Sequence, residues 1–149
     1  MRIDFYHLTA KDISDALPEL ASKVIESNEN MVILTSSKEQ TNFFDSLLWT
    51  FNPDAWLPHG CYKTGDAQRQ PIWITDEYEN PNASSIIMIL DGMSLPNFSD
   101  FKRGLYLFNG KDENSLNKAR TAWSDAKKND CDLHYWQQEA NGRWREKER

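Results

Sequence analysis

The sequence is poor in cysteine and has no long apolar run, and each absence excludes a class of protein. Its two cysteines, Cys61 and Cys131, lie far apart, and no disulfide is expected in a reducing compartment. The longest apolar run, residues 86–90, has the length of a strand, whereas a membrane helix needs about 20 apolar residues. The N-terminus has no apolar segment of the kind found in signal peptides. We therefore predict a cytoplasmic protein that does not associate with membranes.

Motifs for catalysis and cofactor binding are also absent. The chain has no G-x-G-x-x-G or G-x-x-x-x-G-K-[ST] loop for nucleotide phosphates and no G-x-S-x-G turn for a nucleophilic serine. His59 and Cys61 are close together, but a zinc site needs three or four protein ligands. The spacing of His7, His134 and Cys131 does not suggest that they converge there. The sequence predicts a protein that is not an enzyme and binds no cofactor or metal.

The charge of the chain is acidic but unevenly distributed. The 149 residues have a formal net charge of −6, which argues against bulk binding of nucleic acid. Residues 1–110 contain 8 Lys and Arg against 15 Asp and Glu, a net charge of −7. Residues 111–149 contain 9 against 8, a net charge of +1, so the cations are concentrated near the C-terminus. The length fits one domain over residues 1–149.

Hydrophobic periodicity predicts strands alternating with helices. Short runs rich in β-formers predict strands at residues 2–8, 31–34, 71–75, 85–90, 104–108 and 132–138. Helical spacing predicts helices at residues 12–27, from about 38 to 52, and from about 113 to 128. This order predicts a single-domain α/β fold with a largely parallel central sheet and helices on both faces. The fold is Rossmann-like but without a nucleotide site, because the phosphate loops are missing.

Several local signals define where the helices begin and end. Ser36 or Ser37 can cap the second helix, and Asp112 or Asn114 can cap the third. Pro18 is expected in the first turn of the first helix, which would then begin near residue 15 or 16. The charged tail is expected to fray from about residue 143, after a turn at residues 141–142.

One face of the third helix combines an aromatic ring with positive charge. Arg120, Trp123 and Lys127 are spaced i, i+3, i+7 and therefore share a face. One interpretation is a boundary tryptophan packed on the core between solvated neighbours. The other is a site for the C-terminus of an acidic peptide with an aromatic end, since an arginine can hold a carboxylate with two hydrogen bonds.

A second aromatic cluster follows the second helix and contains Trp49, Phe51, Trp56 and Leu57. One interpretation is a loop that folds onto the core through its own side chains. The other is an exposed anchor for a protein partner, because tryptophan is favoured where interfaces gain most of their binding energy.

A set of short segments spread over nearly the whole chain forms a recognisable pattern. The segments are Phe5-Tyr6-His7-Leu8, Leu48-Trp49-Thr50, Phe51-Asn52-Pro53-Asp54, Trp56-Leu57-Pro58-His59-Gly60, Gly65-Asp66, Arg69-Gln70-Pro71-Ile72-Trp73, Ala119-Arg120 with Trp123, and Leu133 with Tyr135-Trp136-Gln137-Gln138. The pattern resembles the chi subunit of bacterial DNA polymerase III, in particular its alphaproteobacterial members.

The resemblance implies a non-catalytic adaptor in DNA replication that belongs to the clamp-loader complex. It implies that the acidic C-terminal tail of single-stranded DNA-binding protein (SSB), which ends in phenylalanine with a free carboxylate, binds at Arg120, Trp123, Ser124, Lys127 and Lys128. It implies a link to the psi subunit, or to another clamp-loader subunit, through a face that Trp49 and Trp56 match here, and we assign Phe51 and Leu57 of the same cluster to that interface. Association with nucleic acid would then be indirect.

Two positions depart from the family pattern. Ser124 stands where the family usually has lysine, and Lys127 stands where arginine is common. Losing one partly exposed cation weakens a carboxylate contact by about 1 kcal/mol. We expect either weaker tail binding or substitution of the missing charge by Lys128.

Two other functions remain as alternatives. A direct single-stranded nucleic-acid binding module would stack bases on Trp136 and Trp144 beside the basic tail, although the acidic composition argues against it. A nucleotide-dependent enzyme would be compatible with the α/β fold, but the sequence has no loop to hold the phosphates.

Overall fold

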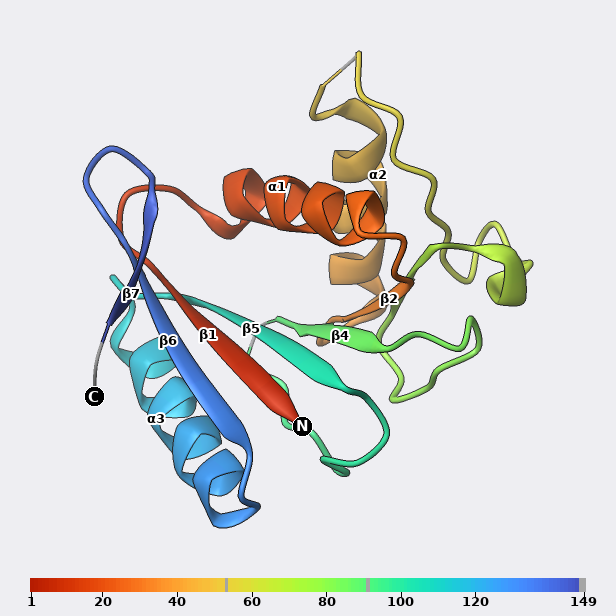
Figure 1. The fold of residues 1–149 in the computed structure, drawn as a ribbon. Coiled ribbons are helices and arrows are strands. Elements are labelled where there is room, and N and C mark those ends of the chain that lie inside the picture. Colours follow the sequence, from red (N-terminus) through yellow and green to blue (C-terminus); the bar gives the residue numbers. More distant parts are fainter. Residues whose placement is uncertain (53, 91, 148–149) are drawn as a thin grey trace.

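Parallel strands dominate the central sheet of the protein (Figure 1). The structure is a computed structural model that describes residues 1–52, 54–90 and 92–147. Over these residues the sheet has seven strands in the order β3-β2-β4-β5-β1-β6-β7. All neighbouring strands are parallel except β6 and β7, which are antiparallel. The strands are β1 (Arg2–Leu8), β2 (Met31–Leu34), β3 (Ile72–Thr75), β4 (Ile86–Ile89), β5 (Arg103–Asn109), β6 (Asp132–Gln138) and β7 (Trp144–Lys147).

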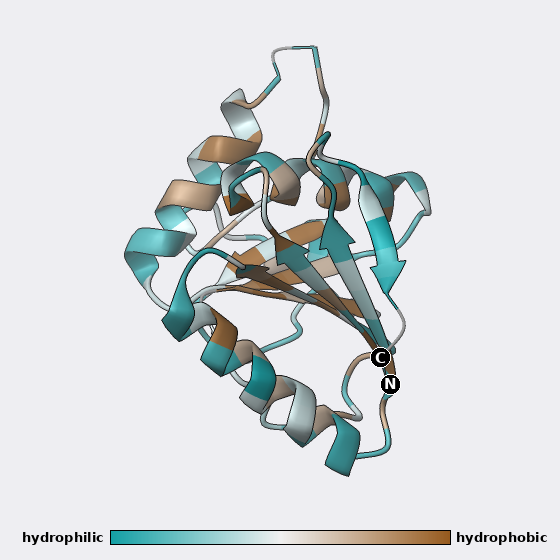
Figure 2. Ribbon diagram, turned by 90° about the vertical axis from the view of Figure 1, so that its left-hand side faces the viewer, coloured by the Kyte–Doolittle hydropathy of each residue, from teal (hydrophilic) through white to brown (hydrophobic). Residues whose placement is uncertain are grey.

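Helices cover both faces of this sheet. On one face lie α1 (Ile13–Glu26) and α2 (Lys38–Thr50), and on the other lies α3 (Glu113–Lys128); a short 3-10 helix, η1, spans Ala67–Arg69. Hydrophobic residues are concentrated in the strands between the two helical layers (Figure 2). The predicted α/β fold with a largely parallel sheet and helices on both faces is therefore confirmed. None of the described helices is long and apolar enough to cross a membrane.

The helix starts follow from hydrogen bonds made by capping side chains. The Ser37 hydroxyl accepts a hydrogen bond from the backbone N–H of Gln40 at 3.2 Å. The Asp112 carboxylate accepts one from the backbone N–H of Ser115 at 3.0 Å, and the hydrogen bonds from Ser115 lower the pKa of Asp112. Of the alternatives, Ser37 and Asp112 are thus the caps.

The prediction that α1 begins near residue 15 or 16 is wrong. The helix begins at Ile13, because the Asp12 carbonyl already accepts hydrogen bonds from the N–H groups of Asp15 and Ala16. Pro18 therefore lies inside the helix, where it has no N–H to donate to the preceding turn. Its ring is buried together with the inner face of α1, and this burial outweighs the missing hydrogen bond.

The prediction of a frayed tail from about residue 143 is also wrong over the residues that the structure describes. After a turn at Gly142, whose φ is +86°, residues 144–147 form β7 and pair with β6. The ring of Trp144 packs edge-on against Tyr6 with a centroid distance of 5.0 Å. The ladder and this aromatic contact hold in place a segment whose own composition is mostly charged.

A buried carboxylate joins the three central strands on the α1 side. Asp4 of β1 has no exposed side-chain surface, and it accepts hydrogen bonds from Arg2 at 2.9 Å and from Arg103 of β5 at 2.7 Å. The indole N–H of Trp136 in β6 donates to the same carboxylate at 2.9 Å. Burial raises the pKa of Asp4, but the hydrogen bonds from Arg2, Trp136 and Arg103 outweigh it, so that the pKa is lowered overall.

Candidate functional site

A groove of about 450 Å³ lies between α3 and the central strands. Aromatic and apolar side chains form most of its surface, and they come from β1, β5, β6 and α3. Its lining residues are Phe5, His7, Phe108, Leu116, Ala119, Arg120, Trp123 and Tyr135. The groove lies near the carboxyl ends of β1 and β5, where ligands commonly bind in α/β sheets.

Trp123 both packs on the core and lines this groove. Its side chain is half-buried and meets the ring of Phe5 edge-on at a centroid distance of 5.0 Å, with Tyr135 at 6.0 Å. The two interpretations of the helix face are thus compatible. The inner edge of the indole fixes α3 on the sheet, and the remaining surface is part of the groove wall.

Arg120 places a permanent positive charge at the edge of the groove. The residue is exposed, and its Nη1 donates a hydrogen bond to Asn117 Oδ1 at 3.3 Å. Within the described residues, its guanidinium pairs with no carboxylate. A guanidinium without a carboxylate partner, placed beside apolar walls, can bind a carboxylate whose neighbouring side chain enters the groove.

A histidine and a tyrosine form the polar part of the groove. The hydroxyl of Tyr135 and Nδ1 of His7 are hydrogen-bonded. Burial lowers the pKa of His7. Burial also raises the pKa of Tyr135, while the nearby positive charge of Arg120 opposes that rise. Both groups are therefore uncharged at neutral pH, and Arg120 supplies the charge.

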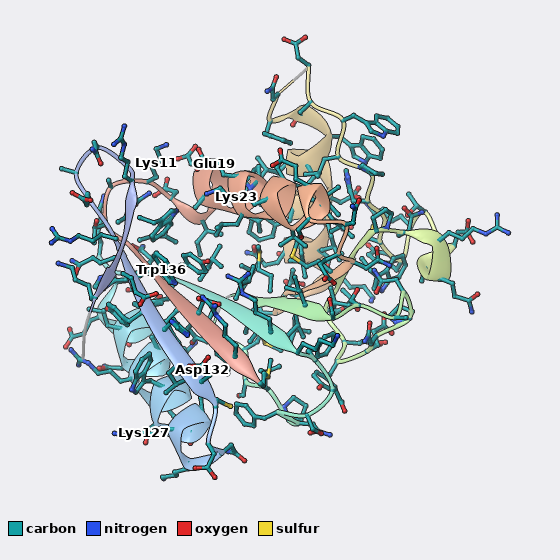
Figure 3. The ribbon with its side chains drawn as sticks, in the orientation of Figure 1. Lys11, Glu19, Lys23, Lys127, Asp132 and Trp136 are labelled. Carbon is teal, nitrogen blue, oxygen red and sulfur yellow. The ribbon has the colours of Figure 1, made fainter. Side chains whose placement is uncertain are left out.

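The other three residues predicted for this site lie outside the groove lining. Ser124, Lys127 and Lys128 are all exposed on α3. Figure 3 shows Lys127 projecting outward from α3. Both lysines are in the last helical turn, where positive charge also favours the negative end of the helix dipole. They can reach a ligand only where it extends beyond the groove.

The second predicted surface is partly exposed and partly core. Trp56 is 79% exposed and Trp49 is 51% exposed. Phe51 is half-buried, and Leu57 is only 5% exposed in the core under α1 and α2, so Leu57 cannot belong to an exposed interface. Sequence reasoning missed two exposed rings in the same region, Phe43 at 52% and Tyr62 at 45%.

The residues considered as metal ligands are part of the packing. His59 is buried, with its two ring nitrogens 2.8 Å from the Leu57 carbonyl oxygen and 3.0 Å from that of Asp45. Its ring also packs against Trp49, with a centroid distance of 4.3 Å. Cys61 is fully buried. In the part of the chain that the structure describes, no group of three or more His, Cys, Asp or Glu is placed to hold a metal ion.

The turn after β1, where nucleotide-binding α/β folds present N–H groups to phosphate, is filled by a side chain of the protein itself. Three successive N–H groups, of Thr9, Ala10 and Lys11, point at Oε1 of Gln138 at 3.3, 3.0 and 2.8 Å. Gln138 comes from the end of β6 and is only 4% exposed. Its amide oxygen thus takes the place that a phosphate oxygen would take.

The two tryptophans of the nucleic-acid alternative are engaged in packing. Trp136 lies parallel to Tyr6, with a centroid distance of 6.3 Å, and its N–H is bound to Asp4. Trp144 meets the same tyrosine edge-on. Both indoles are half-buried, so each offers less ring surface for base stacking than an exposed tryptophan would.

Comparison with known proteins agrees with the resemblance seen in the sequence. The family model described as "DNA polymerase III chi subunit, HolC" matches residues 1–134. A protein of Rickettsia prowazekii (strain Madrid E), named "Probable DNA polymerase III subunit chi", is 30% identical over 107 residues. That alignment includes 72% of this chain and 65% of the relative, so the chain spans about two thirds of the relative's length.

The predicted family and its alphaproteobacterial character are thereby confirmed. Members of this family are accessory subunits of the replication machinery. The chain belongs to the DNA polymerase III chi subunit family.

Proposed function

We propose that the chain is a replisome adaptor that binds the acidic C-terminal tail of SSB in the groove and links it to the clamp-loader complex through the exposed aromatic surface around α2. The observation that carries the proposal is the groove of about 450 Å³, in which aromatic walls lie next to the guanidinium of Arg120. No other described residue in the lining carries a permanent charge.

The chemistry of the groove matches a peptide that ends in phenylalanine. The terminal ring enters between Trp123 and the strand side chains and gains roughly 25 cal/mol for each Å² of apolar surface removed from water. The terminal carboxylate lies at the edge and binds Arg120. Acidic residues upstream meet the exposed Lys127 and Lys128. The site therefore requires both an aromatic side chain and a free C-terminus.

Replacing Arg120 and Trp123 together with alanine is expected to weaken binding of an acidic peptide with a C-terminal phenylalanine at least tenfold, which is about 1.4 kcal/mol. The double change removes the carboxylate partner and one wall of the groove. Fluorescence anisotropy with a labelled synthetic peptide measures the effect. A peptide amidated at its C-terminus should bind wild type more weakly than the free acid does, because it loses the contact with Arg120. Unchanged affinity in the double variant would show that the peptide binds elsewhere.

Replacing Trp49 and Trp56 together with alanine is expected to weaken binding to the clamp-loader complex while leaving peptide affinity within twofold of wild type. Both rings are mostly exposed, so they contribute little to folding and much to any interface that covers them. Surface plasmon resonance with the clamp-loader complex of the same organism, including psi where it is encoded, measures the effect. The double variant of Arg120 and Trp123 is the matched control, because it should retain clamp-loader binding. If either variant lost affinity for the peptide and for the clamp-loader complex to the same extent, misfolding or a shared site would be indicated.

A further inference from the structure

The strand β7 lies beside the groove but outside the part of the chain that matches the family model. The match ends at residue 134, whereas β7 consists of residues 144–147. β7 pairs with β6, the strand that contributes Tyr135 to the groove. Figure 1 shows β7 along the outer side of β6. Any contact that β7 makes with a ligand in the groove therefore comes from residues that the family match does not include.

The register of the β6–β7 pair decides which side chains of β7 face the groove. Lys147 is opposite Tyr135 and Arg145 is opposite Gln137. Residues directly opposite each other in an antiparallel pair project from the same face of the sheet, with Cβ atoms about 5 Å apart. Since Tyr135 lines the groove, Arg145 and Lys147 lie on the groove side.

Contacts of the alternate residues support this assignment. Trp144 packs against Tyr6, which belongs to the core under α1 and α2. The carboxylate of Glu146 lies 3.2 Å from Nδ1 of His134, and His134 is out of phase with Tyr135 along β6. The acidic residue of β7 thus projects from the face opposite to the groove, and the two basic residues project from the groove face.

The two cations of β7 are available for a ligand. Arg145 and Lys147 are both exposed, and neither forms an ion pair with a carboxylate of the described residues. On the opposite wall, Ser124 adds no charge between Arg120 and Lys127. In a chain with a net charge of −6, positive groups from two separate elements border one groove.

We propose that β7 forms a second, cationic wall of the groove, in which Arg145 and Lys147 bind the acidic residues that precede the terminal aromatic residue of the peptide. This inference rests on the proposed function, because it needs the terminal residue in the groove. A peptide in extended conformation advances about 3.3 Å for each residue. Acidic side chains one to three residues before the terminus therefore come within reach of the long side chains next to Tyr135.

Replacing Arg145 and Lys147 together with glutamine tests the proposal. The variant is expected to bind the acidic peptide about three- to tenfold more weakly at low salt, as is typical for the loss of two exposed ion pairs, and the difference should shrink at high salt. For a peptide with every aspartate replaced by asparagine, the variant and wild type should agree within about twofold. Glutamine keeps the aliphatic stems, so that β7 remains paired, which circular dichroism and thermal unfolding verify.

The matched control is the double replacement Lys23→Gln and Lys63→Gln. It changes the net charge by the same amount, but Lys23 is on α1, across the sheet from α3, and Lys63 is in the loop before η1 (Figure 3 labels Lys23). Its affinity for the acidic peptide should equal that of wild type. A loss as large as in the β7 variant would mean that only net charge matters and would overturn the proposal.

The outcomes separate the failure of this inference from the failure of the proposed function. If the β7 variant binds the acidic peptide like wild type while the Arg120 and Trp123 double variant does not bind, the second wall is wrong and the adaptor function stands. If wild type does not bind the acidic peptide, both are wrong. If the β7 variant loses affinity for a single-stranded oligonucleotide and not for the peptide, β7 is a nucleic-acid surface and the inference is overturned.

Discussion

Replacing Asp4 with alanine is expected to lower the free energy of unfolding by about 3 kcal/mol, the largest effect of any change considered for this protein. The carboxylate is fully buried and binds Arg2, Arg103 and the indole N–H of Trp136, so its removal leaves donors on three strands without their acceptor. The guanidinium groups of Arg2 and Arg103 are partly exposed and can form hydrogen bonds with water instead. The expected loss of stability is therefore at the lower end of the range for breaking a buried ion pair. Urea denaturation followed by circular dichroism measures it.

The pH dependence of stability provides an independent check on Asp4. Its pKa is lower in the folded protein than its ordinary value of 3.8, so the stabilisation is fully present above that value and is lost as the pH falls below it. The variant Asp4→Asn has no such titration. The difference in unfolding free energy between wild type and Asp4→Asn should therefore be constant at neutral pH and shrink as the pH falls below 3.8.

Asp132 provides the control for this prediction. It lies on the adjacent strand β6, but its side chain is 71% exposed. Asp132→Asn should change the unfolding free energy by less than about 0.5 kcal/mol. Equal effects of the two substitutions would contradict the structural role assigned to the buried carboxylate.

Replacing Gln138 with leucine is expected to destabilise the protein by roughly 2–3 kcal/mol. Leucine has a similar volume but no oxygen, so the N–H groups of Thr9, Ala10 and Lys11 lose their common acceptor. These groups form the turn that leads into α1, and their loss should loosen the start of that helix. Urea denaturation measures the change, and hydrogen exchange of the three amides should be faster than in wild type.

Glutamate at position 138 separates the loss of the acceptor from the loss of the side chain. A carboxylate can still accept the three hydrogen bonds, and negative charge is favoured near the N-terminus of α1. Gln138→Glu should therefore cost less than about 1 kcal/mol. If the leucine and glutamate variants unfolded at the same urea concentration, the acceptor role of Gln138 would be wrong.

The fold could be predicted from sequence where local pattern and burial agree. The runs at residues 2–8 and 132–138 became β1 and β6 with the same limits, and the middle of each run is rich in aromatic and aliphatic residues that favour strands. The start of α1 was predicted too late because of Pro18. Packing of the inner helix face overrides the one hydrogen bond that proline cannot make. β7 was missed because Arg145, Glu146 and Lys147 show no apolar alternation, and the strand depends on its ladder with β6.

The groove could be predicted only in part. Helical spacing placed Arg120 and Trp123 on one face, and the structure puts both in one groove. The opposite side of the groove comes from Phe5, Phe108 and Tyr135, on strands whose adjacency depends on the order β5-β1-β6 and not on any local pattern. Leu57 was assigned to an interface for a related reason, since an apolar run in a loop does not reveal which residues turn inward.

The division of the helices between the two faces of the sheet has a mechanical consequence. Trp49 belongs to α2 and Trp123 belongs to α3, and the hydrogen-bonded sheet separates the two helices. In the proposed function, a ligand in the groove and a partner on the α2 side would therefore not compete for space, and either could dissociate while the other stays bound. An adaptor with the proposed function would hold one partner near the other at an effective concentration on the order of millimolar. Two weak contacts would then be sufficient to keep the partners co-localised, and each contact could still break and re-form.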